Sequence, residues 1–248
     1  MTLTIAVLSD IHGNVAALDA VLADIATHRP SRLWVAGDLL LGGPRPAEVV
    51  ARLQDLERAG AHIVAGNTDV AVTDADYAAA FPWLDEVPAS HRDAADWARD
   101  QLDDDQLDWV RRLPIERRVW SGETLALLVH GSPGSQTAGL PADLDPSTTV
   151  ERVTRTDARV ICCGHTHVAD VRELGRKLIV NPGSCGFAHD GDPAAGWALV
   201  ELPEDGAPDA TLHRTTYDAQ TVAEEVSSRG LAGDVYRAAT VRTGRFVR

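Results

Sequence analysis

The sequence predicts an α/β fold, and three observations support this prediction. Short apolar segments alternate with amphipathic segments of helical period over residues 3–66, a pattern typical of a parallel sheet with crossover helices. The connections between these segments are short and rich in glycine, proline and aspartate. The chain has 248 residues, 44% of them hydrophobic, which is enough to bury one large core. We therefore expect a single domain over residues 1–248 that carries a small helical insertion.

The elements of residues 3–66 are the clearest. We expect strands over residues 3–8, 32–36 and 61–65, and helices from Val15 to about His28 and from Pro46 to about Gly60. Each strand is a short apolar run. Asn14 can act as the N-cap of the first helix, because its side-chain oxygen can accept a hydrogen bond from the first turn. Pro46 is a favoured first residue of a helix, and Gly60 is a favoured residue just after one.

Residues 74–113 differ in character from the segments around them. Apolar residues recur at helical spacing in the second half of this stretch, which predicts an inserted pair of helices. Three tryptophans, Trp83, Trp97 and Trp109, lie among its charged residues. They could stack on a nucleotide base, but a small core that fixes the insertion to the body is the favoured interpretation.

The second half of the chain predicts mainly strands. We expect them over residues 117–120, 124–129, 159–163, 197–202 and 211–216, with a further hairpin turning at Gly175-Arg176. Thr148 and Glu151 predict a capping box at the start of a helix, and Val222 with Val226 predict a last helix. The loop from Ser132 to Pro146 is long enough to be a lid over a site.

The composition excludes several classes of partner. A net charge of −14 and a pI near 4.9 argue against duplex nucleic acid or an anionic membrane as the main partner, because nonspecific attraction to a polyanion needs a basic face.

The N-terminal segment has no basic start and no long apolar stretch, so we expect a cytoplasmic location. Cys162, Cys163 and Cys185 are too few and too poorly spaced for a disulfide framework, and we expect buried thiols.

Polar residues that suit metal ions follow five of the predicted strands. They are Asp10, His12, Asp38, Asn67, His130, His165 and His167. Because ligands collect at the carboxyl ends of strands in open α/β sheets, loops far apart in the sequence can converge there. Seven oxygen and nitrogen donors exceed the need of one ion, and they suit two ions that share a bridging carboxylate. Such a pair can activate a water molecule and stabilise an in-line displacement at phosphorus.

The order of these residues resembles the signature of the calcineurin-like metallophosphoesterases. The motifs are Asp10-x-His12, Gly37-Asp38, Gly66-Asn67, His130 and Gly164-His165-x-His167. The chain is most similar to the small bacterial and archaeal branch of YfcE-like phosphodiesterases and diadenosine tetraphosphatases, which also shows Gly-Pro-x-Pro after the second motif and Asn-Pro-Gly-Ser later. The resemblance spans nearly the whole chain and implies a β-sandwich of two sheets flanked by helices.

The resemblance also implies a role for each residue of the signature. Asp10, His12 and His167 would hold one metal ion, Asn67, His130 and His165 would hold the other, and Asp38 would bridge them. A metal-bound hydroxide would attack phosphorus directly, with Asp38, Asn67 and His130 at the catalytic centre. The donor set is compatible with manganese, iron, zinc, cobalt or nickel, and we expect manganese to support activity in vitro.

One residue departs from the pattern of the superfamily. Many members carry histidine after Gly-Asn, where it can protonate the leaving oxygen, whereas this chain carries Thr68. Threonine cannot act as an acid near neutral pH. We therefore expect the substrate to be a small nucleotide-type phosphodiester or phosphoanhydride, whose leaving group is a stable anion, rather than an ordinary monoester.

Four further residues are candidates for supporting roles. Thr68, Arg45 and His189 lie in loops that follow the motifs and could contact the substrate phosphate. Asp69 would orient a metal ligand or its loop through hydrogen bonds.

Two other functions stay open at this point. The chain could be a scaffold that keeps the fold as a binding surface, as a coat-complex relative of this family does, although all seven ligand positions are filled. It could also be a protein phosphatase, although that class usually has an acid after Gly-Asn and a wide open groove. No motif indicates an oligomeric state.

Overall fold

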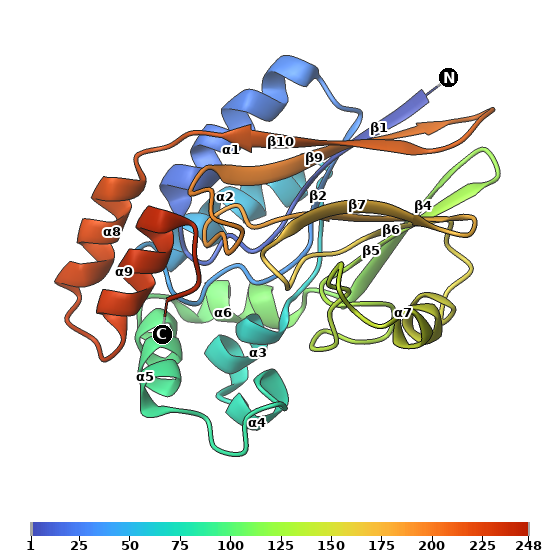
Figure 1. Ribbon diagram of the computed structural model, residues 1–248. Helices are drawn as coiled ribbons and strands as arrows, with labels where there is room; N and C mark the ends of the chain where they lie inside the picture. Colours follow the sequence, from blue (N-terminus) through green and yellow to red (C-terminus); the bar gives the residue numbers. More distant parts are fainter. Residues whose placement is uncertain (1, 248) are drawn as a thin grey trace.

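Two five-stranded β-sheets pack against one another in the computed structural model, which describes residues 2–247 (Figure 1). The strands of the first sheet are, in spatial order, β10 (Asp209–Thr215), β9 (Ala195–Pro203), β1 (Thr2–Leu8), β2 (Arg32–Val35) and β3 (His62–Ile63). Those of the second sheet are β4 (Glu116–Ser121), β5 (Thr124–Val129), β6 (Val160–Cys162), β8 (Lys177–Pro182) and β7 (Ala169–Leu174). Both sheets combine parallel and antiparallel pairs.

Helices pack on the outer faces of the two sheets and beside the ends of the strands (Figure 1). They are α1 (Val15–His28), α2 (Pro46–Arg58), α3 (Asn67–Asp74), α4 (Tyr77–Ala80), α5 (Ala89–Asp100), α6 (Asp104–Arg111), α7 (Pro146–Val153), α8 (Ala219–Ser228) and α9 (Asp234–Thr243). A large apolar core joins the first sheet to α1, α2, α3, α5 and α6, and a smaller core lies between the second sheet and α7. The prediction of an α/β fold with a two-sheet sandwich flanked by helices is therefore confirmed. None of the helices described here combines the length and hydropathy needed to cross a membrane.

The uninterrupted apolar sequence of β1 is explained by burial on both of its faces. Ile5 and Val7 belong to the core between the two sheets, whereas Ala6 and Leu8 belong to the core beneath the helices. Successive side chains of a strand point to opposite faces, and a strand that is covered on both faces is apolar throughout. The central strands therefore form a rigid base for the loops at their ends.

The insertion differs from the predicted pair of helices. It contains α4, α5 and α6, and the preceding helix α3 already begins at Asn67. This early start has a local cause, because the Asp69 carboxylate accepts a hydrogen bond from the Gly66 N–H at 2.8 Å and caps the first turn. Two of the three tryptophans pack in the core as expected, whereas Trp83 is 55% exposed. The core interpretation is therefore wrong for Trp83.

Three other predictions at the level of elements need correction. Helix α7 is capped by Asp145, whose side chain accepts a hydrogen bond from Thr148 N at 3.0 Å, because Pro146 is already the first helical residue. The strand expected over 61–65 has two residues, since it lies at the sheet edge and pairs only with β2. Helix α9 was not predicted, because its buried side chains include Asp234 and Thr240 and so give no apolar stripe. The three cysteines are free and buried, as expected.

Helices α8 and α9 form a hairpin at the side of the sandwich (Figure 1), and a buried arginine joins this hairpin to the body. Arg229 donates hydrogen bonds to the Gly42 and Gly43 carbonyl oxygens at 2.9 and 2.8 Å. Its guanidinium also forms an ion pair with Asp234 at 2.7 Å and lies 4.5 Å from the centre of the Trp97 ring. Both members of the ion pair are at least 95% buried, and the two hydrogen bonds from Arg229 to the carbonyl oxygens fix the hairpin against the loop that follows β2.

We predict that Arg229→Met lowers the free energy of unfolding by about 3–5 kcal/mol, because it removes one partner of a buried ion pair. Arg45→Met is the matched control, since Arg45 also joins the body to α8 by pairing with Glu225, but its side chain is 45% exposed. The control should cost less than about 1 kcal/mol. Urea denaturation followed by circular dichroism measures both values, and equal losses would contradict the role of Arg229.

Candidate metal centre

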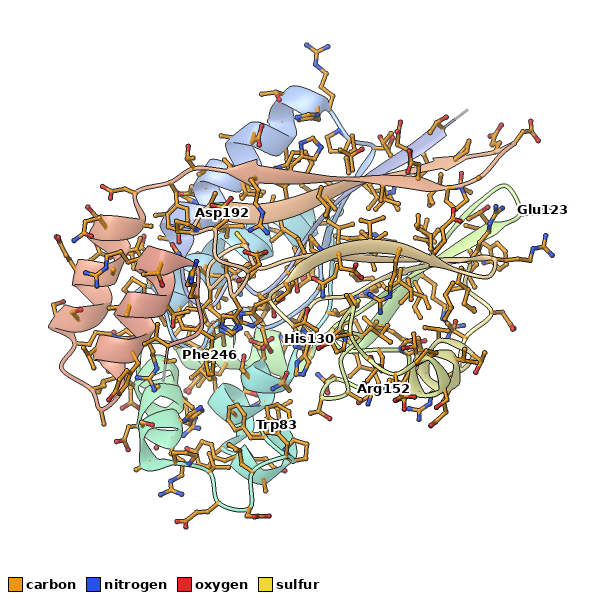
Figure 2. All side chains as sticks on the ribbon, viewed as in Figure 1. Trp83, Glu123, His130, Arg152, Asp192 and Phe246 are labelled. Atoms are coloured by element: carbon orange, nitrogen blue, oxygen red, sulfur yellow. The ribbon has the colours of Figure 1, made fainter. Side chains whose placement is uncertain are left out.

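The seven side chains predicted to bind metal lie together at the ends of five strands. Asp10 and His12 follow β1, Asp38 follows β2, Asn67 follows β3, His130 follows β5, and His165 and His167 follow β6. Figure 2 shows His130 between the two sheets and the helices of the insertion. The loops interlock through main-chain hydrogen bonds, including Asp10 N to Gly37 O and His12 N to Asp38 O, each at 3.0 Å.

The backbone is strained at five of these seven positions. Asp10, His12, Asp38, His165 and His167 have φ angles of 55°, 52°, 52°, 69° and 59°. This left-handed region costs a residue other than glycine roughly 1–2 kcal/mol. Such strain persists only where the surrounding structure enforces it, and it concentrates at functional sites. The fold therefore holds these side chains in orientations that the local chain would not adopt by itself.

The potential ligand atoms form two groups that share one carboxylate. The first group contains Asp10, His12, Asp38 and His167, and the second contains Asp38, His130 and His165. Within each group the ligand atoms lie within 4.8 Å of one another. Asn67 joins the second group, since its Oδ1 lies 2.9 Å from His165 Nδ1 and 3.0 Å from His130 Nε2.

Backbone carbonyls fix the orientation of three of the histidines. The Nδ1 atoms of His12, His130 and His167 face the carbonyl oxygens of Leu41, Ala36 and Phe187. A carbonyl oxygen can only accept, so each Nδ1 carries a proton and each Nε2 is directed toward the centre, where its lone pair can bind a cation once the atom carries no proton. His165 instead directs its Nδ1 inward.

This arrangement of nitrogen atoms fits a bound cation. His12 Nε2 and His167 Nε2 lie 3.2 Å apart, and so do His165 Nδ1 and His130 Nε2. Two lone pairs at this separation repel each other unless a proton or a metal ion lies between them. Neutral imidazole nitrogens and carboxylate oxygens are suitable ligands for divalent transition metals. The residues therefore form a candidate centre for divalent metal binding.

The electrostatics of the centre follow from burial and from Asp38. Burial lowers the pKa of His165 to about 3 and that of His167 to about 4, so both rings are neutral ligands. Burial also opposes protonation of His130, but the carboxylates of Asp38 and Asp10 outweigh it and raise its pKa to about 9. Burial alone would raise the pKa of Asp38, yet His130 and His12 hold it well below its usual range. Asp38 is thus a fully buried anion that depends on nearby positive charge.

Asp69 connects the loops that carry Asp38 and Asn67. Its carboxylate accepts hydrogen bonds from Leu39 N and Gly66 N, both at 2.8 Å. Burial and the nearby Asp38 raise the pKa of Asp69 to about 7. The loops approach so closely that a Cβ atom at Gly66 would lie 2.1 Å from Asp38 Oδ1. Asp69 therefore lies where it can orient a ligand and its loop through hydrogen bonds.

A cavity of about 670 Å³ opens over the two ligand groups. Thr68 and His189 line this cavity, and the buried atoms Thr68 Oγ1 and His189 Nε2 have no hydrogen-bond partner among residues 2–247. Both are thus placed to contact a ligand. Arg45 is not among the lining residues, and its guanidinium pairs with Glu48 and Glu225 on the surface. The structure does not bring Arg45 to the site.

The outer wall of the cavity comes from segments that sequence reasoning did not assign to the site. Trp83 and His91 contribute from the insertion, whereas Tyr236 and Phe246 contribute from α9 and the residues after it. Gly233 and Gly244 bracket α9, and this pair of glycines was the signal that could have revealed the helix. Figure 2 shows Phe246 to the left of His130 and Trp83 below it.

The loop from Ser132 to Pro146 is not a lid over this cavity. None of its residues is among those that line the cavity in the described part of the chain. Gln136 instead donates hydrogen bonds to the Ala65 and Gly66 carbonyl oxygens at 2.9 and 3.2 Å, and Gly139 lies directly against the His165 ring. These contacts make the loop a fixed support behind His165.

Known proteins share the fold of this chain. Residues 3–205 match the calcineurin-like phosphoesterase superfamily domain. The uncharacterized protein MJ0912 of Methanocaldococcus jannaschii is 26% identical over 214 residues, which cover 79% of this chain and 82% of that protein. The crystal structure of a metallophosphoesterase from Sphaerobacter thermophilus matches 98% of this chain and 100% of its own, with a TM-score of 0.75 and 26% identity. That of hypothetical protein PH1004 from Pyrococcus horikoshii OT3 matches 97% and 98%, with a TM-score of 0.81 and 19% identity. This chain therefore belongs to the calcineurin-like phosphoesterase superfamily.

Proposed function

We propose that the protein hydrolyses phosphodiester or phosphoanhydride bonds of small nucleotide-type substrates with the help of two divalent metal ions. The observation that supports this proposal best is the pair of buried ligand groups that share Asp38. Asp10, His12 and His167 would hold one ion, and Asn67, His130 and His165 would hold the other. Two ions bound there would supply an activated water molecule and neutralise charge on the phosphoryl oxygens. We propose manganese for activity in vitro, with iron, zinc, cobalt and nickel as the other candidates.

The residues of the chain prepare the site before any substrate binds. Asp38 provides one carboxylate oxygen to each group, and its Oδ1 also accepts a hydrogen bond from Thr68 N at 2.9 Å. The backbone carbonyls keep the histidine lone pairs directed inward, so binding an ion requires no rotation of these rings. The Thr68 hydroxyl and the His189 ring can then contact the phosphoryl group from the cavity side.

The chemistry of the cavity favours a stable leaving group. Threonine cannot protonate a leaving oxygen near neutral pH. Burial lowers the pKa of His189 to about 2, so this ring is neutral and its role is a hydrogen bond to the substrate. Nucleotide phosphates and aryl oxides leave without protonation, and they are the expected leaving groups.

Two observations favour this proposal over its alternatives. A scaffold protein would not need seven potential ligands directed at one another, five of them on strained backbone. A protein phosphatase would need an open groove, whereas helices of the insertion and the C-terminal hairpin surround a cavity of about 670 Å³, a size suited to a small molecule. The cytoplasmic location stays a prediction.

We predict that Asp38→Asn lowers turnover of bis(4-nitrophenyl) phosphate by at least about 10²-fold, because the shared ligand loses its charge. Release of nitrophenol in the presence of manganese measures turnover, and calorimetric titration should show weaker manganese binding. Asp100→Asn, at an exposed position on α5, is the charge-matched control and should behave as wild type. A near-normal rate of Asp38→Asn would refute the bridging role. No turnover by the folded wild-type protein with any of the five metals would instead favour the scaffold.

We also predict that Thr68→His increases activity on phosphate monoesters relative to diesters, by about 10- to 100-fold, because the new imidazole can protonate a poor leaving group. Thr68→Val is the matched control, since valine has the shape of threonine without its hydroxyl. It should weaken binding of both substrate classes and leave their ratio unchanged. The measurement compares kcat/KM for methyl phosphate, an alkyl monoester, and for bis(4-nitrophenyl) phosphate, and an unchanged ratio in Thr68→His would refute the leaving-group argument.

A further inference from the structure

We propose that Trp83 and Phe246 form two aromatic platforms beside the metal centre, which bind planar rings of the substrate. Each ring would be the base of a nucleoside or another aryl group, and the nucleoside or aryl group would be esterified to a single phosphate. This inference rests on the proposed function and specifies the class of substrate for the same site.

The Trp83 side chain is exposed, although the other tryptophans of the insertion are packed. Its exposed fraction is 55%. The Trp83 ring contacts His165 edge to face, with ring centres 5.8 Å apart, and it contacts Phe81 in the same manner at 5.9 Å. The free indole face therefore lies beside a ligand of the second metal group, where a planar group could cover it.

Phe246 has the corresponding position at the first metal group. It lies 4.9 Å from the His189 ring, which stacks on His167 with ring centres 4.1 Å apart. Phe246 is 52% exposed, and Tyr236 beside it on the cavity wall is 48% exposed.

The segment that carries Phe246 is tied down on both sides. Gly191 N donates to Gly244 O at 2.7 Å, and Val247 N donates to Thr240 Oγ1 at 3.1 Å. The ring is thus held in place before a ligand binds. The two platforms come from different segments and lie beside different ligand groups, Trp83 beside His165 and Phe246 beside His189 and His167, as a phosphodiester with two organic groups would require.

The charge of the cavity indicates one phosphate rather than a chain of phosphates. Among the lining residues within 2–247, Arg237 is the one lysine or arginine. Its guanidinium is already engaged, because it pairs with Asp234 at 3.0 Å and donates to the Ala232 and Ser90 carbonyl oxygens. A polyphosphate chain would need further cations beyond the metal centre. The aromatic lining is instead suited to stacking, which tolerates any planar ring.

The first experiment compares two substrates that share a leaving group and a charge, namely 4-nitrophenyl phenyl phosphate and 4-nitrophenyl methyl phosphate, with the manganese-loaded protein. Wild type should prefer the phenyl ester in kcat/KM. Trp83→Ala or Phe246→Ala should reduce this preference by about 5- to 100-fold, the range expected for one stacked ring. Trp83→Phe should retain most of it. Trp120→Ala is the matched control, because Trp120 is 62% exposed on β4 and does not line the cavity.

The second experiment measures binding alone, by calorimetry with the manganese-loaded protein. Adenosine 5′-monophosphate should bind at least about 10-fold more tightly than ribose 5-phosphate, and Trp83→Ala or Phe246→Ala should remove this difference. A comparison of the binding of phenyl phosphate and of methyl phosphate distinguishes a site for any aryl group from a site for nucleobases. Only a site for any aryl group should prefer phenyl phosphate.

The outcomes separate this inference from the proposed function. If wild type hydrolyses neither diester, the proposed function fails, and the binding experiment alone decides whether the platforms exist. If wild type is active but both alanine variants keep the ring preference and the binding difference, the platforms are refuted. Tighter binding of adenosine 5′-triphosphate than of the monophosphate by more than about 10-fold would refute the restriction to one phosphate.

Discussion

The buried carboxylate of Asp38 is the constraint on which the rest of the site depends. It is an anion with almost no access to water, and it belongs to both ligand groups at once. A buried charge is costly unless positive charge or hydrogen bonds compensate for it. The chain offers Thr68 N–H and the His130 ring for this purpose, and divalent cations would complete the compensation. The same anion that is costly to bury therefore attracts divalent cations.

The fold maintains this arrangement through packed strands and connected loops, and not through the backbone preference of the ligand residues themselves. Strands covered on both faces form a fixed base, and the loops at their ends are joined by main-chain hydrogen bonds, by Asp69 and by the close approach of Gly66 to Asp38. Five ligand residues adopt left-handed backbone angles as a result. The strain is local, whereas the contacts that enforce it are spread over both sheets, so no single loop could form the site in isolation.

The potential metal ligands and one side of the cavity wall come from different parts of the chain. The residues that match the superfamily end at 205, and they include all seven potential metal ligands. Helices α8 and α9 lie beyond this range, yet Tyr236 and Phe246 form part of the cavity wall. Arg229 fixes their hairpin to the loop after β2. One fold can serve different substrates when the loops that carry the ligands are kept and the wall of the cavity varies.

The sequence by itself determined the α/β class, the order of the strands along the chain and the seven ligand positions, because each is set by residues close together in sequence. An apolar run followed by Asp10 and His12 is a local pattern, and so is each of the other motifs. Only the tertiary structure decided that Trp83 faces the cavity, that Arg45 is engaged on the surface, and that α9 completes the wall. These outcomes depend on contacts between segments more than 50 residues apart, such as Arg45 with Glu225 and Phe246 with His189. Helical periodicity and composition do not show which distant segment lies next to a given side chain. Only the packing of the folded chain determines this.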